Sequence, residues 1–142
     1  ALCDAVDEPV LKQICANIAA DEFRHYNLFY TNSKRYGRVE NSTLLERMLA
    51  AISRMRESDD DELAYAFYCG SGDRRPYDRR TYYRAYAGRA YSHYRYSHVA
   101  RGINMTLKAI GISPQSWIAN AVVRLGWKLF RSRTRHLHAA VA

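Results

Sequence analysis

The sequence predicts an all-α protein, in a single helical domain that spans residues 1–142. Apolar residues recur every three or four positions in several segments, as they do along a helix that buries one face. Proline and glycine divide the chain cleanly between these segments. No segment alternates apolar and polar residues, with β-branched enrichment, over the length of a strand.

Capping residues define the first two predicted helices. The first begins at Pro9, because an acidic residue before it can cap the helix and proline fits the first turn. It runs without a breaker to Tyr36, and Gly37 is expected to end it. The second helix can be capped by Ser42 or Thr43. Its apolar positions are Leu44, Leu45, Met48, Leu49, Ile52 and Met55.

The next two predicted helices lie on either side of a glycine-rich loop. Acidic residues 59–62 favour the start of a third, short helix through residues 64–69. Residues 70–73 form the loop. A long fourth helix is then predicted from Pro76 to about Ile110, with two glycines inside it.

The fifth predicted helix spans roughly residues 115–133 and leads into a basic tail over residues 131–142. We expect its apolar stripe to pack into the core, although such a basic helix can also lie on an anionic membrane or dock on a protein partner. Trp117 and Trp127, near the edges of the stripe, are therefore candidate docking residues. The stripe consists of Ile118, Ala121, Val122, Leu125 and Leu129.

Composition indicates a soluble globular chain, with 48% hydrophobic and 25% charged residues. No apolar run approaches the roughly 20 residues of a membrane span, and the start of the chain lacks the features of a secretory signal. Three cysteines cannot all pair within the chain and fit no zinc spacing, so we expect reduced thiols in the cytoplasm or mitochondrial matrix. The net charge of +8 permits several anionic partners and selects none.

One motif on the first predicted helix carries chemistry. Glu22 and His25 fill a gap in the apolar stripe between Ile18 and Phe29. Both side chains should therefore lie on the buried face, about 60° apart around the helix axis. A buried ionised carboxylate is costly unless it is paired or bound to a metal, and Glu-x-x-His lets both side chains reach one metal site. The alternative is a surface glutamate beside a hydrogen-bonded, partly buried histidine.

The residues around this motif resemble a known family. Residues 11–25, LKQICANIAADEFRH, followed by Tyr30 and Thr31, resemble the second metal-binding helix of the soluble acyl-carrier-protein desaturases and related ferritin-like proteins. The resemblance ends by Tyr36. It implies a ferritin-like helical bundle, or its C-terminal half, with additional short helices.

The resemblance also implies a metal site and an activity. Glu22 would bridge or chelate two irons, His25 would ligate one of them, and Asp21 would orient a ligand by hydrogen bonding. The implied function is that of a di-iron oxidoreductase, with O2-dependent oxidase or desaturase chemistry on an acyl or other hydrophobic substrate.

The rest of the chain does not complete such a site. A di-iron bundle takes a glutamate from each of two helices and Glu-x-x-His from each of two others. None of the later glutamates has a histidine three residues on, and the resemblance places the missing ligands before Ala1. We therefore expect an N-terminal half or other protein chains to cover the apolar face. The alternative function is a non-catalytic ferritin-like structural subunit of a larger assembly.

Tyrosine and arginine alternate in residues 74–101. Such a pattern can bind nucleic acid, but here one helix face gathers tyrosines and alanines while the arginines lie mostly elsewhere. We therefore expect a structural role, with docking to a protein partner as the second possibility and nucleic acid not favoured. The candidate docking residues are Arg84, Tyr86 and Arg89. We expect Tyr83, Ala87, Ala90, Tyr94 and His98 on the buried face, with His98 hydrogen-bonded.

Overall fold

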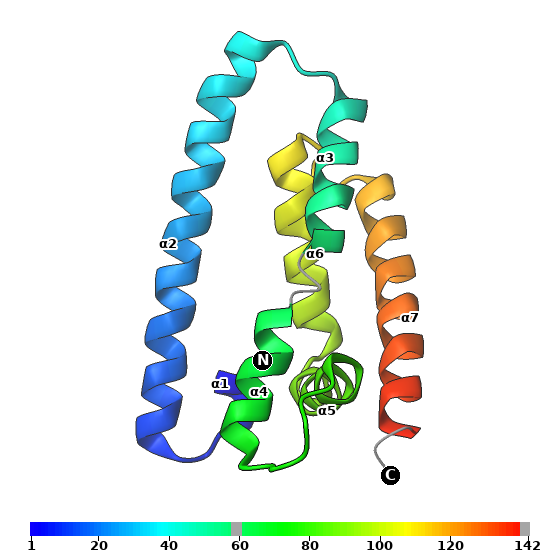
Figure 1. Cartoon of the computed structure of the whole chain (residues 1–142). Coiled ribbons are helices and arrows are strands. Elements are labelled where there is room, and N and C mark those ends of the chain that lie inside the picture. Colours follow the sequence, from blue (N-terminus) through cyan, green and yellow to red (C-terminus); the bar gives the residue numbers. More distant parts are fainter. Residues whose placement is uncertain (58–60, 140–142) are drawn as a thin grey trace.

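The structure, a computed structural model, describes residues 1–57 and 61–139, with side chains described for residues 1–37, 41–54 and 61–136. Within these residues α-helix is the only regular secondary structure, which confirms the all-α part of the predicted fold class; the ferritin-like bundle stays a prediction (Figure 1). The seven helices of this part are α1 (Leu2–Ala5), α2 (Pro9–Glu40), α3 (Leu44–Glu57), α4 (Asp61–Ser71), α5 (Arg79–Ser92), α6 (Tyr96–Ile110) and α7 (Trp117–Ala139).

The long helix α2 stands along one side of the molecule (Figure 1). Its start is as predicted. The Glu8 carboxylate accepts hydrogen bonds from the backbone N–H groups of Val10 (3.0 Å) and Leu11 (2.6 Å), and a proline occupies the first turn. These bonds satisfy donors that a helix start otherwise leaves unpaired.

The connection from α2 to α3 differs slightly from the prediction. Gly37 does not end α2, which continues for about one more turn until Asn41 adopts a left-handed conformation with φ 46°. Thr43, rather than the serine before it, caps α3. Its N–H donates to the Glu46 carboxylate (2.7 Å), and its hydroxyl accepts from the Glu46 N–H (3.3 Å). This reciprocal pair is a capping box.

The predicted long fourth helix is in fact two helices, α5 and α6, because the chain turns between Ser92 and Tyr96. The His98 side chain stabilises the break: its Nδ1 accepts a hydrogen bond from the backbone N–H of Arg95 (3.0 Å). Its Nε2 therefore carries the proton and donates to the Asp4 carboxylate (2.7 Å). The prediction that His98 is partly buried and hydrogen-bonded is confirmed.

The packed core is small and lies among α4, α5, α6 and α7. In residues 74–101, Ala87 is buried as predicted, but Tyr83 and Ala90 are half-buried and Tyr94 is exposed. The break between α5 and α6 ends the single face that these residues were expected to share. The buried apolar residues are Ala64, Tyr82, Ala87, Leu107, Ala119 and Val123.

Helix α7 buries a different face from the predicted one. Ala119 and Val123 are buried where α7 packs on α5 and α6. A Cβ atom on Gly126 would lie 2.5 Å from the Cδ1 atom of Ile103, so the glycine allows α6 and α7 to approach closely. The predicted core stripe is wrong: Ile118, Val122, Leu125 and Leu129 are exposed. Helix α7 has two apolar faces, and spacing alone does not tell which one is covered.

Two predicted segments reach beyond the described part of the chain. Residues 131–139, predicted as a basic tail, continue α7, whereas residues 140–142 lie outside the described residues. Asp59 and Asp60, at the predicted start of the third helix, also lie outside them. The described part of that helix begins at Asp61 and extends to Ser71, slightly beyond the predicted end.

The molecule is open rather than compact. Its accessible surface is 11040 Å², whereas a compact monomer of 16.4 kDa exposes about 7,500 Å². Among the described residues, helix α2 packs extensively only on the short helix α1. Much of the apolar surface of α2, α3 and α7 is therefore left uncovered within one chain.

Candidate functional site

Glu22 and His25 lie near the middle of α2, on the same face as Ile18 and Phe29. The Glu22 carboxylate and the His25 Nδ1 atom are 3.8 Å apart. The expected burial is not found within this chain, because the side chains are 73% exposed for Glu22 and 62% for His25. Their apolar neighbours are also open: Ile18 is 55% exposed and Phe29 is 69% exposed. The whole stripe faces solvent.

Helix α2 meets the rest of the molecule through another face. The Tyr26 hydroxyl donates to the backbone carbonyl of Met105 on α6 (3.1 Å). The ammonium groups of Lys34 and Lys108 lie 4.7 and 5.0 Å from the centre of the Tyr30 ring. At 100° per residue, the two tyrosines lie about 90° around the axis from the Glu22–His25 pair. The contact with α6 therefore leaves the Glu22–His25 face free for another helix.

The ligands present do not fit a di-iron centre within one chain. Such a centre needs about four carboxylates and two imidazoles, and this face offers one of each. In the described part of the chain, no three His, Cys, Asp or Glu side chains come together closely enough to hold a metal ion. Asp21, expected to support a ligand, instead forms an ion pair with Arg24 one turn along the same helix.

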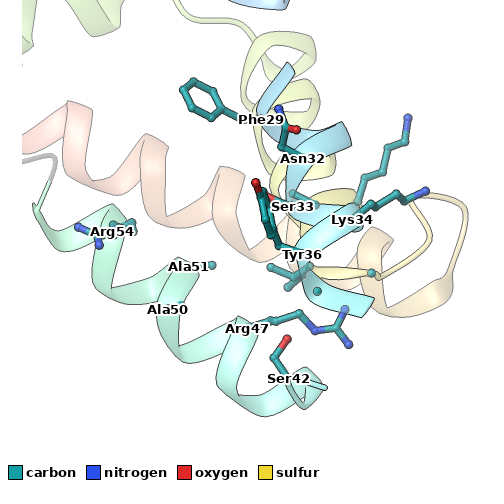
Figure 2. A pocket seen from close by; sticks show the side chains of 15 residues that line it. Phe29, Asn32, Ser33, Lys34, Tyr36, Ser42, Arg47, Ala50, Ala51 and Arg54 are labelled. Atoms are coloured by element: carbon teal, nitrogen blue, oxygen red, sulfur yellow. The ribbon is translucent and has the colours of Figure 1, made fainter. Parts of the chain in front are cut away.

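A cleft opens between the C-terminal half of α2 and α3, with a volume of about 960 Å³ (Figure 2). Phe29 and Tyr36 line it from α2, and Ala50 and Ala51 line it from α3. Because Phe29 and Tyr36 belong to the open stripe, the cleft is the upper continuation of that face. Four basic residues and no acidic residue are among those described around it; the basic ones are Lys34, Arg47, Arg54 and Lys108.

The predicted docking residues divide into exposed and packed ones. Arg84 is exposed on α5, and Trp117, at the start of α7, is 78% exposed. By contrast, Tyr86 packs edge-on against the Phe67 ring, and the Arg89 guanidinium lies 5.2 Å above the same ring. Trp127 is also engaged within the fold, since it stacks on Phe130 and meets Tyr96 edge-on.

Sequence reasoning missed a polar cluster that organises the tyrosine-rich region. Asp73 lies in the loop after α4. Its carboxylate accepts a hydrogen bond from the Tyr82 hydroxyl (2.8 Å) and forms an ion pair with the Arg75 guanidinium (2.6 Å). The Arg75 guanidinium, with the Arg75 N–H and the Tyr82 hydroxyl, holds the Asp73 pKa far below its usual range. Nearby, burial and a hydrogen bond to the Asp61 carboxylate raise the pKa of Tyr77 to about 12. In the sequence, the only sign of this cluster is the glycine-rich loop of residues 70–73, which ends in Asp73.

Tyr77 and Tyr82, together with Tyr65 and Tyr68, have a structural role, as the sequence suggested. Their rings pack on one another between α4 and α5, and the two hydroxyls named above are bound to carboxylates. They are therefore not a free stacking platform for nucleic-acid bases. Within the described residues, no helix combines the length and the apolar character that a bilayer span requires.

Comparisons with protein-family models, with curated proteins and with solved structures find no match to the chain. The ferritin-like resemblance therefore depends on the residues of α2 alone. What the structure adds to it is one open apolar face, with Glu22 and His25 at its middle.

Proposed function

We propose that this chain is a helical subunit of a larger assembly, in which other helices cover the open face of α2. The observation that carries the proposal is the exposed surface, which exceeds that of a compact monomer by about 3,500 Å². Stable subunit interfaces bury from about 1,200 to more than 5,000 Å² summed over both partners, or roughly half of that per partner, so the uncovered area of one chain is large enough to form one.

The distribution of exposed residues supports the same proposal. Single exposed apolar side chains are normal on a monomer, but contiguous apolar stripes mark interaction surfaces. Here the stripe on α2 continues into the cleft beside α3, and a second stripe runs along α7. A helix with an uncovered apolar stripe is stabilised when another helix packs on it.

A pair of charge substitutions on α2 tests this role. Phe29→Glu places a charge on the open face, and we expect it to prevent association while the helical circular dichroism of the chain is retained. Thr31→Glu, on the opposite side of the same helix, is the matched control and should leave association unchanged. Equal effects of the two variants would exclude the open face as the interface.

A second candidate function is favoured by the position of Glu22 and His25 on this face. We propose that Glu22 and His25 become metal ligands once another helix covers this face. The centre would be carboxylate-rich, of the ferritin-like kind, and its remaining ligands would come from residues other than those described here. Iron is the metal that the resemblance implies. Oxidation or desaturation of an acyl or other hydrophobic substrate is the activity to be tested for such an assembly.

A further inference from the structure

The open stripe of α2 is symmetric about its own midpoint. Leu11 and Tyr36 lie at its ends, Ile18 and Phe29 lie further in, and Glu22 and His25 flank the centre. In each of these three pairs the two residue numbers add up to the same total. Two copies of α2 packed antiparallel, with a twofold axis between residues 23 and 24, would therefore place each residue opposite its pair mate in the other copy.

This pairing is chemically complementary along the helix. Ile18 meets Phe29 of the second copy, and Leu11 meets its Tyr36, so apolar side chains cover apolar side chains. Glu22 meets His25, so a carboxylate faces an imidazole on both sides of the axis. Where Ile14 falls opposite a polar residue, that residue is the small Ser33. A twofold interface requires a self-complementary patch of this kind.

A parallel pair of helices would lack the pairing of carboxylate with imidazole at the centre of the stripe. It would place Glu22 opposite Glu22 of the second copy, and two carboxylates in contact across an interface repel each other. The antiparallel direction is thus favoured by the charges, whereas the apolar residues would face apolar residues in either direction.

The cleft beside α3 supplies room for the second copy. Antiparallel pairing brings residues 11–18 of one copy to the level of residues 29–36 of the other, where the 960 Å³ cleft lies. A helix rises 1.5 Å per residue, so residues 11–18 form a segment about 12 Å long at the level of the cleft.

The charges at the two ends of α2 also agree with this direction. The described side chains around the cleft include Lys34, Arg47 and Lys108 and no carboxylate. The first eight residues of the chain contain three acidic residues and no lysine or arginine. Antiparallel pairing brings this acidic N-terminal segment towards the basic end of the other copy.

We propose that the open face of α2 binds a second copy of this chain in an antiparallel dimer, with Glu22 of each copy beside His25 of the other. The proposal rests on the proposed role of the chain as a subunit of an assembly and names its partner. The dimer brings two carboxylates and two imidazoles to the twofold axis, which is the number of ligands that one tetrahedral metal ion takes.

Cysteine cross-linking tests the proposal, because Cys15 and Asn32 form another symmetric pair on this face. The background variant Cys3→Ser/Cys69→Ser keeps Cys15 alone. Adding Asn32→Cys should convert most of the protein, treated with a short bismaleimide, to a covalent dimer linked between positions 15 and 32. The two positions are too far apart on one helix to react within a chain.

Three controls define the direction and the face. Cys15 alone should give no cross-link, since a link between two copies of Cys15 would mean parallel pairing. Thr31→Cys, added to the same background on the opposite side of α2, should give none either. Asn32→Cys combined with Cys15→Ser should also remain unlinked, because position 32 does not meet its own counterpart.

The outcomes separate this inference from the proposed function. A covalent dimer linked between positions 15 and 32 supports the antiparallel pairing. Association without this link would overturn the antiparallel pairing, and a poorly folded monomer would overturn the second copy as the partner; the subunit role stands in both cases. A well-folded monomer that melts sharply and gives no link would overturn both.

Discussion

Asp73 joins the loop after α4 to the start of α5. Its carboxylate accepts from the Arg75 guanidinium (2.6 Å), from the Arg75 backbone N–H (3.0 Å) and from the Tyr82 hydroxyl (2.8 Å). Charge-assisted hydrogen bonds of this kind favour the ionised carboxylate and so depress its pKa. The folded state is thus stabilised when Asp73 is ionised.

This depressed pKa predicts a loss of stability in acid. Because the folded-state pKa lies below the ordinary value of 3.8, the stabilisation is complete above that value and declines as the pH falls towards the folded-state pKa. We expect Asp73→Asn to lower the free energy of unfolding at neutral pH, and the deficit relative to the wild type to shrink in strong acid. Urea unfolding across the acid range measures this. Asp21→Asn, on the exposed surface of α2, is the control, and an equal deficit at every pH would contradict the prediction.

Glu22 and His25 lead to a prediction about metal content. One carboxylate and one imidazole per chain cannot hold two irons, so the purified chain should bind well under two equivalents of iron per chain. Elemental analysis after dialysis against iron(II) under anaerobic conditions measures the content. Glu22→Gln should lower it further, whereas Glu62→Gln, away from this face, should not. Two tightly bound irons in a monomeric chain would show that other ligands exist.

The position of a single residue could be predicted where it depends only on the residue's own helix. The spacing of Glu22 and His25 with Ile18 and Phe29 placed them on one face, because helical periodicity is a property of the segment alone. The Asp73 cluster was missed, because it joins a loop to Tyr82 on the next helix and no periodic pattern reports such a contact. Whether a face is covered likewise depends on elements elsewhere in the chain or outside it.

Among the helices, α6 and α7 form a close contact that depends on Gly126. A side chain there would meet the Ile103 side chain, because even a Cβ atom would lie 2.5 Å from its Cδ1 atom. Gly102, on α6, has no atom within 4 Å of the place where its Cβ would lie. The two glycines therefore differ in what they permit, although both lie inside helices.

We expect Gly126→Val to lower the free energy of unfolding by about 1–3 kcal/mol, because an overpacked contact forces neighbouring side chains to move. Gly102→Val is the matched control and should change it by less than about 0.5 kcal/mol, since the space is open and valine is a slightly better helix former than glycine. Thermal or urea unfolding of the two variants measures the difference. Equal effects would contradict the close approach of α6 and α7.

The sequence predicted where helices begin better than where a helix is interrupted. Glu8 before Pro9 and the Thr43–Glu46 pair are local capping signals, and both are found in the structure. The break between α5 and α6 carries no proline or glycine. It is stabilised by His98, whose ring also bonds to Asp4 nearly a hundred residues earlier in the chain. Such a long-range contact cannot be predicted from the spacing of residues in one segment.

For the molecule as a whole, the main feature is that the helices are formed but bury only a small core, so that many of their apolar side chains are exposed. The sequence predicted most of the helices, though not the break between α5 and α6, and it predicted that the face of α2 would need a cover. It did not predict that α7 leaves its longer stripe exposed while a face of small residues packs inside. Both open stripes are consistent with a chain that reaches its final packing in an assembly.

Sedimentation velocity of the isolated chain at low micromolar concentration, combined with its thermal melting curve, tests most directly whether the open face of α2 needs a partner. An uncovered apolar stripe predicts that the chain either associates or, as a monomer, melts broadly without a cooperative transition. If the second copy is the partner, the sedimenting species is a dimer. A compact monomer with a sharp melting transition would show that the bundle closes on itself, and the subunit role would then have to be abandoned.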